Sequence, residues 1–424
     1  MVEKKSRNIN TLKPTVLDLF CGAGGMSLGF QNAGCNILAG IDKNPYAIKT
    51  HHRNFPKCNF KLNAMEIESI TDISQLKIEP GEVDILIGGP PCQVFSVVGI
   101  GKMKSLKKDI GTDPRNFMYK HFIKYINYYR PLVFVLENVD NLQNKPIFKQ
   151  IIKELELGLP EHENTYPGYK TYPDVLTASD YGVPQHRKRL FIVGIRQDID
   201  IKFDFSMVKK SKSVTVGEAI SDLITLYPLS RYTPLISLYM RYLSMGGKMV
   251  GLAGHKQKDA RKPYLCPSES DYQKKMRKAL TEEEELKGVW NHICRSHNPV
   301  DIVSFAMIPP GGKYTDLPES LRRYRWDIFD DKYKRLPWDK PSWTLTAHMQ
   351  KDCLAYIHPK QHRTISVREA ARLQSFPDNF VFDAPMTKMF ELVGNSVPPL
   401  LAEAIAKPIV KQVQNYYNSH PQAK

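Results

Sequence analysis

The first half of this chain alternates short apolar runs, rich in β-branched residues, with stretches of helical periodicity. The apolar runs cover residues 15–20, 36–41, 83–87, 131–136 and 189–193. Strands that alternate with helices predict a mostly parallel, doubly wound sheet, because parallel neighbours need a crossover between them. The sequence therefore predicts an α/β fold, with helices over residues 117–126, 366–374 and 399–410.

A polar or reactive residue follows most of these predicted strands. Cys21 and Gly22 follow the first, Asp42 the second, Cys92 the third and Glu137 the fourth. In open parallel sheets, ligands bind outside the carboxyl ends of the strands. We therefore expect these residues to form a site along one edge of the sheet.

Cys92 comes directly after two prolines, Pro90 and Pro91. Because proline fixes its own backbone, the thiol would be presented rigidly. A cysteine held in this way could act as a nucleophile. The alternative is a buried cysteine that behaves as a small hydrophobic residue.

The loop after the first predicted strand is rich in glycine. Gly22, Gly24 and Gly25 would let a ligand approach the backbone, and the following helix would offer free amide donors. Asp42 lies roughly 20 residues further on, where dinucleotide-binding proteins place an acceptor for ribose hydroxyls. Ser27 replaces the third glycine of that fingerprint, so adenosine-type cofactors such as S-adenosylmethionine remain open beside NAD.

The second half of the chain is basic and its periodicities are broken. Residues 200–360 are rich in Tyr, Arg, Lys and Pro, which predicts a second domain, and residues 282–285 read as a solvated helix face. The chain has 60 Lys and Arg against 44 Asp and Glu, a net charge of +16. Such a surplus favours a polyanionic partner such as nucleic acid, although a merely soluble basic protein has the same composition.

The number and spacing of the cysteines narrow the possible classes of protein further. Seven are scattered through the chain without a C-x-x-C pair, so we expect no metal site and no disulfide framework. This pattern fits a reducing cytoplasm. No run of 18 apolar residues occurs, which argues against a membrane span.

Five motifs occur in a characteristic order between about residues 15 and 410. They are Asp18-Leu-Phe-Cys-Gly-Ala-Gly-Gly25, Gly88-Gly-Pro-Pro-Cys-Gln-Val-Phe-Ser96, Glu137-Asn-Val139, Gln185-His-Arg-Lys-Arg189 and Gly394-Asn-Ser-Val397. In sequence and order they resemble the motifs of the DNA (cytosine-5) methyltransferases. The resemblance implies a Rossmann-like, S-adenosylmethionine-dependent methyltransferase domain with a smaller, irregular target-recognition domain. The expected catalytic domain covers residues 1–196, the recognition domain 197–362, and residues 363–424 return to the catalytic domain.

The resemblance also implies catalytic roles. The Cys92 thiolate would attack C6 of a cytosine that has left the base stack, and Glu137 would hold the N3/N4 edge of that base. Arg189 would meet the O2 atom, and Arg187 would support the pocket. Either arginine could instead contact a phosphate or be a plain surface charge.

Contacts to the cofactor are carried over in the same way. Phe20 would lie against the adenosine, Asp42 would bind the ribose, and Asn395 and Ser396 would close the methionine side. Asn63 stands where the family usually has an Asp near the adenine amino group. The full predicted set is Phe20, Gly22, Gly24, Gly25, Asp42, Asn63, Pro91, Asn395 and Ser396.

Two further segments are expected to contact DNA. Residues 96–109 resemble the mobile loop of the family, and a plain solvent loop is the alternative. Their lysines, Lys102, Lys104, Lys107 and Lys108, suit phosphates, which fix position but not sequence. Thr344 and Thr346 resemble a short element of the recognition domain.

The function implied is site-specific methylation of cytosine C5 in double-stranded DNA, by the modification component of a bacterial restriction–modification system. We expect a monomer in the cytoplasm, associated with the nucleoid when bound to DNA, whose cognate restriction endonuclease acts separately. Two rivals remain. A tRNA cytosine methyltransferase usually carries a Cys-Phe-Thr element, which is absent here. A catalytically dead homologue would usually have lost Cys92, Glu137 or Arg189.

Overall fold

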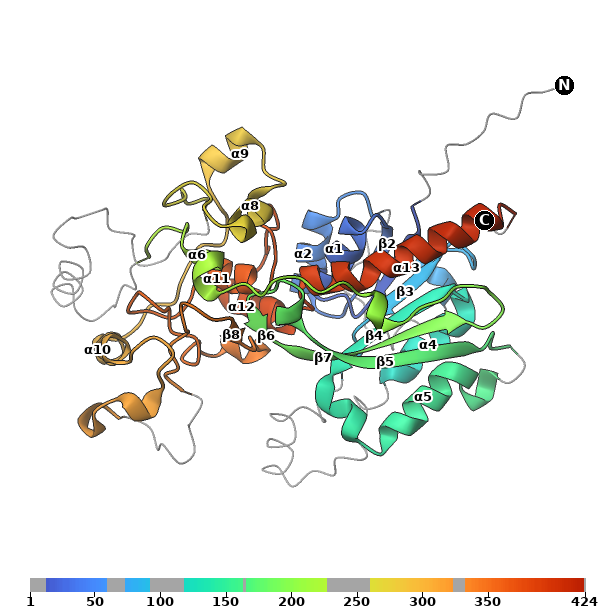
Figure 1. Cartoon of the computed structure of the whole chain (residues 1–424), viewed down its shortest axis with the longest axis horizontal. Coiled ribbons are helices and arrows are strands. Elements are labelled where there is room, and N and C mark those ends of the chain that lie inside the picture. The colour runs from blue at the N-terminus through green and yellow to red at the C-terminus, as the bar shows by residue number, and fades with distance from the viewer. Residues whose placement is uncertain are drawn as a thin grey trace. The chain divides into compact units, whose positions relative to one another are not determined.

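The computed structural model describes residues 13–58, 73–91, 118–162, 165–226, 260–322 and 332–422. The chain forms two compact units, each built from separate stretches of sequence (Figure 1). Unit 1 contains Met1–Thr177, Lys188–Ser211 and Val397–Lys424. Unit 2 contains Ala178–Arg187 and Lys212–Ser396.

Unit 1 is built on a six-stranded sheet with the order β2-β1-β3-β4-β7-β5. The strands are β1 (Thr15–Leu19), β2 (Asn36–Ile41), β3 (Ile85–Gly88), β4 (Val133–Val139), β5 (Tyr169–Thr177) and β7 (Lys188–Arg196). The first four strands in the sheet order are parallel, and β7 runs antiparallel to both β4 and β5. The predicted α/β fold is therefore confirmed, and all five expected strands are present.

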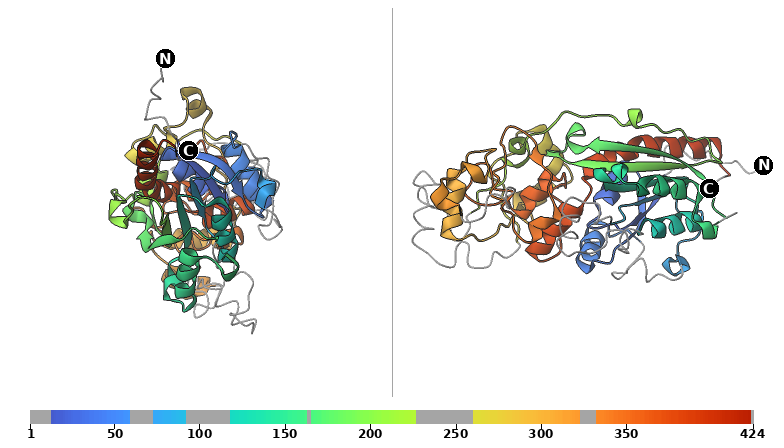
Figure 2. Two further views of the ribbon diagram at one scale, coloured as in Figure 1. Left: turned by 90° about the vertical axis from the view of Figure 1, so that its right-hand side faces the viewer. Right: turned by 90° about the horizontal axis from the view of Figure 1, so that it is seen from below.

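Helices cover both faces of this sheet (Figure 1 and Figure 2). They are α1 (Gly25–Asn32), α2 (Pro45–Asn54), α4 (Met118–Tyr129), α5 (Ile147–Leu157) and α13 (Pro399–Ser419). Buried residues of α4, among them Phe122 and Ile126, share one apolar core with Leu86 of β3 and Phe134 of β4. On the other face α1 packs so closely on α13 that a Cβ at Gly29 would lie 2.4 Å from the Cβ of Ala402.

The far end of α13 is fixed to the sheet by a buried carboxylate. Asp84, just before β3, accepts a hydrogen bond from the Tyr417 hydroxyl. It also accepts one from the backbone N–H of Thr15, at 2.8 Å, where β1 begins. One side chain thus connects the first strand, the third strand and the last helix.

Where the structure describes unit 2, it has little sheet and many short helices. Its strands β6 (Gln185–His186) and β8 (Ser342–Trp343) pair in parallel. Its helices are α6 (Val216–Ile220), α8 (Asp271–Arg277), α9 (Glu282–Lys287), α10 (Pro299–Met307), α11 (Val367–Leu373) and α12 (Met386–Asn395). Four of them, α6, α8, α9 and α11, begin with a capping box, in which side chains satisfy the free amides of the first turn.

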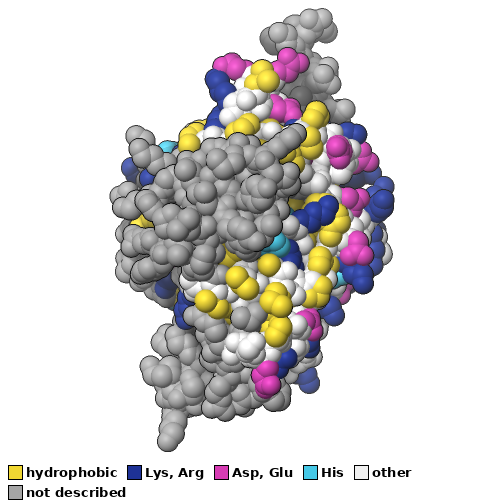
Figure 3. Space-filling view, turned by 90° about the vertical axis from the view of Figure 1, so that its left-hand side faces the viewer, with side chains coloured by type: hydrophobic (Ala, Val, Ile, Leu, Met, Phe, Trp, Pro, Cys, Tyr) yellow, Lys and Arg dark blue, Asp and Glu magenta, His cyan; other side chains and the backbone are white. Residues whose placement is uncertain are grey.

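One helix of unit 2 exposes an apolar face. Val300, Val303 and Met307 of α10 are all exposed, and their spacing places them on one side of the helix. Figure 3 shows a face of the molecule on which apolar side chains lie among basic and acidic ones. None of the helices within the described ranges is long and apolar enough to cross a membrane.

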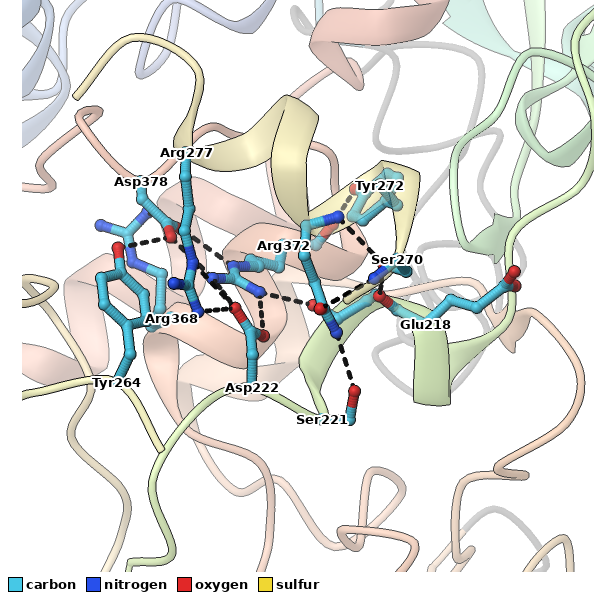
Figure 4. Close-up of polar contacts among 12 residues, drawn as sticks. Glu218, Ser221, Asp222, Tyr264, Ser270, Tyr272, Arg277, Arg368, Arg372 and Asp378 are labelled. Carbon is cyan, nitrogen blue, oxygen red and sulfur yellow. Dashed lines mark hydrogen bonds and ion pairs between the residues drawn. The ribbon is translucent and has the colours of Figure 1, made fainter. Parts of the chain in front are cut away.

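A buried network of charges organises unit 2 (Figure 4). The Arg372 guanidinium binds Asp378, with Nε–Oδ1 at 2.9 Å and Nη2–Oδ2 at 2.6 Å, and it also contacts Asp222. Arg277 donates to Asp222 from Nε at 3.0 Å, and the Tyr264 hydroxyl donates to Asp378 at 2.7 Å. Burial alone would raise the pKa of Asp378, but the neighbouring guanidinium groups lower it below its ordinary value.

Helices α11 and α12 belong to unit 2, where Arg372 of α11 pairs with Asp222. One expectation about the residues around this network needs correction. Residues 282–285 were expected to be only a solvated face. Glu285 instead pairs with the buried Arg277, with an Oε1–Nη1 distance of 2.7 Å.

Among the described residues of unit 2, three histidines are buried. Burial lowers the pKa of His292 to about 4 and the pKa values of His297 and His358 to about 3. His292 contacts the Ser366 hydroxyl at 2.9 Å, and His297 accepts from the backbone N–H of Thr364 at 3.2 Å. These side chains are therefore neutral in the folded state near pH 7.

These histidines predict that unit 2 loses stability in mild acid. Above about pH 6.5 the three histidines are neutral in both the folded and the unfolded chain, so they do not make the free energy of unfolding depend on pH there. As the pH falls from about 6.5 toward 4, the unfolded chain binds protons that the folded chain cannot. Each histidine should then lower the free energy of unfolding by up to ~1.4 kcal/mol per pH unit.

Urea unfolding followed by tryptophan fluorescence checks this prediction, because all four tryptophans lie in unit 2. His297→Gln should reduce the dependence of the unfolding free energy on pH. His348→Gln, at an exposed histidine, is the matched control and should leave the dependence unchanged. A wild-type unfolding free energy that stays constant from pH 7.5 to 5 would contradict the prediction.

Candidate active site

Glu137 and Arg189 form an ion pair where β4 and β7 lie side by side. In this antiparallel pair Glu137 lies opposite Phe191, and Val139 lies opposite Arg189. Residues two apart on a strand share a face, so Glu137 and Arg189 are diagonal neighbours on the same face. Arg189 Nε lies 3.0 Å from Glu137 Oε1, and their side chains are only 16% and 13% exposed.

The segment that leads to Cys92 lies against this pair. A Cβ added to Gly89 would lie 3.0 Å from Glu137 Oε2, so only glycine leaves the carboxylate its full space. The Asn138 side chain donates from Nδ2 to the Pro90 carbonyl at 3.2 Å. Cys92 itself lies outside the described residues, and the chain reaches it one residue after Pro91.

This arrangement has a defined chemical capacity. A carboxylate accepts hydrogen bonds, while a guanidinium presents several donors in a planar fork. Because they lie side by side where β4 ends and β7 begins, the carboxylate can accept from the donors of a planar, polar ring while the guanidinium donates to its acceptors. The chain continues from Pro91 to Cys92, whose thiol is the predicted nucleophile.

The glycine-rich loop at the end of β1 is held in left-handed backbone conformations. Phe20, Gly22 and Gly24 have φ values of 58°, 55° and 96°, respectively. Left-handed backbone is strained for any residue but glycine, so Phe20 stores strain at this point. Phe20 is half-buried, and Gly25 begins α1.

Asp42 closes the other side of this loop. Its carboxylate accepts from the backbone N–H of Gly22 at 2.9 Å and from that of Asn44 at 2.8 Å. Burial raises the pKa of Asp42, although these hydrogen bonds act against the rise. Each carboxylate oxygen has a second lone pair, so Asp42 can also accept from the hydroxyls of a bound sugar.

The space beside the loop fits a cofactor. A Cβ added to Gly22 would meet no atom of the described residues within 4 Å, so open space lies over this backbone. The partly exposed Phe20 ring and the Asp42 carboxylate flank the same loop. An aromatic surface, an open backbone and an acceptor suit an adenosine-type group.

Arg187 lies in unit 2 and is almost wholly buried, unlike Arg189. Its guanidinium donates from Nη1 to the Leu345 carbonyl at 2.7 Å and from Nη2 to the Gly394 carbonyl at 3.2 Å. Gly394 also lies against the Thr346 backbone, because an added Cβ would be 2.3 Å from the Thr346 carbonyl carbon. Three of the segments picked out in the sequence therefore meet inside unit 2.

The other predicted residues have the following places. The Thr344 hydroxyl donates to the His186 carbonyl at 2.7 Å, and the Thr346 hydroxyl lies 3.3 Å from that of Tyr356. Asn395 is exposed, whereas Ser396 is buried and donates to the Leu392 carbonyl at 2.7 Å. Asn63, Lys102, Lys104, Lys107 and Lys108 lie outside the described residues.

Comparison with known proteins decides the family. The model of the C-5 cytosine-specific DNA methylase family matches residues 14–411 of this chain. The chain belongs to the C-5 cytosine-specific DNA methylases. This membership confirms the resemblance seen in the motifs, and the chain is a DNA cytosine-5 methyltransferase of restriction–modification type.

Individual relatives of this methylase cover nearly its whole length. The type II methyltransferase M.DdeI of Desulfomicrobium norvegicum is 32% identical over 94% of this chain and 89% of its own. M.AgeI of Thalassovita gelatinovora is 32% identical over 93% of this chain and 98% of its own. A crystal structure described as a candidate DNA modification methyltransferase of an E. coli prophage matches with a TM-score of 0.70 and 25% identity, covering 96% of this chain and all of that one.

Sequence reasoning assigned no structural role to several polar residues of this methylase, although Gln185 stands in one of the motifs quoted above and Ser27 replaces a glycine of the fingerprint. Gln185, fully buried, accepts from the backbone N–H of Leu345 at 2.8 Å and donates to Gln374 at 2.5 Å. Ser27 and His51 are buried beneath the glycine loop. The place of Gln185 in a motif with two arginines was the one signal in the sequence, whereas His51 stands in an ordinary helical pattern.

The close approach at Gly394 predicts a large effect of one methyl group. Gly394→Ala should lower the free energy of unfolding of unit 2 by about 2–3 kcal/mol, because the Cβ would overlap the Thr346 backbone. In an exposed helix the same change would stabilise by ~1 kcal/mol. Urea unfolding measures it, with Asn395→Ala at the exposed neighbour as control. Equal stability of Gly394→Ala and wild type would contradict the packing described here.

Proposed function

We propose that this methyltransferase transfers a methyl group from S-adenosylmethionine to C5 of a flipped-out cytosine in a specific double-stranded DNA sequence, through a covalent bond between Cys92 and C6. It would serve as the modification component of a restriction–modification system. The observation that carries the proposal is the Glu137–Arg189 ion pair next to the segment that leads to Cys92.

A nucleophile is needed because cytosine C5 reacts poorly with an electrophile. Cytosine C5 is too electron-poor to accept a methyl group unaided. When the Cys92 thiolate bonds to C6, the C5–C6 electron pair becomes available at C5. S-adenosylmethionine, when bound, supplies an electrophilic methyl group. Loss of the C5 proton to a base then expels the thiolate, so Cys92 is regenerated.

Glu137 and Arg189 would bind the base during this reaction. Glu137 would hold the N3/N4 edge and stabilise a proton on N3 as charge develops there. The Nε of Arg189 contacts Glu137 and its Nη1 donates to the Lys188 carbonyl at 2.7 Å, so Arg189 would donate to O2 from Nη2. Arg187 touches two backbone carbonyls of unit 2, so we assign it a positioning role.

The cofactor site would use the glycine loop. Phe20 would lie against the adenosine, Gly22, Gly24 and Gly25 would allow close approach, and Asp42 would accept from the ribose. The fit rests on the open space at Gly22 and on the acceptor capacity of Asp42. Pro91, Asn63, Asn395 and Ser396 complete the proposed set by resemblance.

The net charge of +16 supports DNA as the partner. Lys102, Lys104, Lys107 and Lys108 are proposed phosphate contacts, and Thr344 and Thr346 proposed contacts of the recognition domain, for which residues 197–362 are the proposed range. The relatives named above are type II methyltransferases. We infer a cytoplasmic, monomeric enzyme whose cognate restriction endonuclease is a separate protein.

A covalent adduct tests the proposal. Plasmid-length DNA made with 5-fluorocytosine in place of cytosine presents every short target sequence. Fluorine at C5 cannot leave as a proton does, so Cys92 should stay bonded to C6. With S-adenosylmethionine present, we expect a denaturant-resistant protein–DNA band.

Cys92→Ala is the control for this adduct. It should form no band and lose turnover by on the order of 10⁴-fold or more, yet still bind S-adenosylmethionine in calorimetry. An adduct from Cys92→Ala, or normal turnover by it, would refute the covalent mechanism. A band only with fluorinated RNA would favour a tRNA methyltransferase, and none with either polymer a catalytically dead homologue.

A further inference from the structure

A buried hydrogen-bonded trio lies under the glycine loop of unit 1. Ser27 Oγ contacts Asp18 Oδ2 at 2.5 Å and His51 Nε2 at 3.2 Å. Asp18 belongs to β1, Ser27 to α1 and His51 to α2, and all three are at most 4% exposed. The loop lies between Asp18 and Ser27, so their hydrogen bond joins the two ends of the loop.

The His51 ring supports the loop from below. A Cβ at Gly24 would lie 2.9 Å from His51 Cδ2, and a Cβ at Gly40 would lie 2.7 Å from His51 Nε2. The ring stacks on Phe55 with a centroid distance of 4.4 Å. His51 therefore packs between the loop and the end of β2, the strand that Asp42 follows.

This loop needs such support because its backbone is strained. Phe20 is a non-glycine residue with a φ of 58°. A conformation of this kind is unfavourable and persists only where the surroundings enforce it. On one side the loop is held by the bond from Gly22 to Asp42 and by that from the Cys21 N–H to the Ile41 carbonyl. The trio holds the other side.

We propose that His51 is a positioning residue for the cofactor, which acts through Ser27 and Asp18 to hold the loop over residues 20–24 in the conformation that receives S-adenosylmethionine. The inference rests on the proposed function and deepens it, because none of the three side chains belongs to the proposed set of cofactor contacts.

The positions of the protons in the trio determine which substitution of His51 is conservative. Burial lowers the pKa of His51 to about 4, so its ring is neutral at pH 7. Burial likewise raises the pKa of Asp18 to about 7, against the hydrogen bond from Ser27. When Asp18 is ionised, Ser27 donates to it and His51 Nε2–H donates to Ser27. A glutamine amide can supply that donor, whereas phenylalanine fills the space without one.

The test is calorimetric titration of the DNA-free protein with S-adenosylmethionine. His51→Phe should raise the Kd on the order of tenfold, because the strain at Phe20 is no longer balanced. Ser27→Ala should do the same, and the double variant should add little. His51→Gln should recover most of the affinity, and His52→Phe at the exposed neighbouring histidine should bind like wild type.

Steady-state kinetics separates positioning from a merely structural role. His51→Phe should raise the KM for S-adenosylmethionine about as much as the Kd, while kcat at saturating cofactor and the KM for DNA change less than about threefold. If His51→Phe does not fold, Ser27→Ala serves in its place.

Three results would overturn the inference. They are an unchanged Kd in His51→Phe, a fall in kcat at unchanged KM, and equal losses of affinity in His51→Gln and His51→Phe. Failure of the wild-type protein to bind S-adenosylmethionine would instead refute the proposed function, so the two failures are distinguishable.

Discussion

The register between β4 and β7 is the constraint on which the proposed chemistry depends. It places Glu137 and Arg189 on one face as diagonal neighbours. A slip of one residue would turn one of them to the opposite face. Both strands carry long buried apolar stretches, so a slip would move these side chains out of the positions in which they pack. Packing of the core thus fixes the distance between the two charges.

The two units position their polar residues by different means. In unit 1 the sheet brings strand ends together, so Glu137, Asp42 and the glycine loop follow from the order of the strands. In unit 2 short helices are joined by buried charges, with Arg372 shared between Asp222 and Asp378. Removing one partner of such a pair typically costs 3–5 kcal/mol, because the other charge stays buried.

The sequence predicted most of unit 1 because its strands are continuous apolar runs. It missed β5, an edge strand that alternates poorly and contains Pro173, which an edge position tolerates. It also missed α12. The long-range pairing of Arg372 with Asp222 was not predicted either, because such a pairing leaves no trace in local periodicity.

The order of the motifs identified the family, but motifs do not reveal which other residues hold the motif residues in place. The paired Glu137 and Arg189 were both expected, and the structure adds that they contact each other. The residues beneath the loop, Ser27 and His51, lie 24 positions apart and meet only in the folded chain.

The most direct test of the account is where the transferred methyl group arrives. Purified protein, S-adenosylmethionine with a labelled methyl group and unmethylated double-stranded DNA would be incubated, and the DNA digested to nucleosides and separated. The account predicts that all the label elutes as 5-methylcytosine. Label in N4-methylcytosine or N6-methyladenine would contradict it.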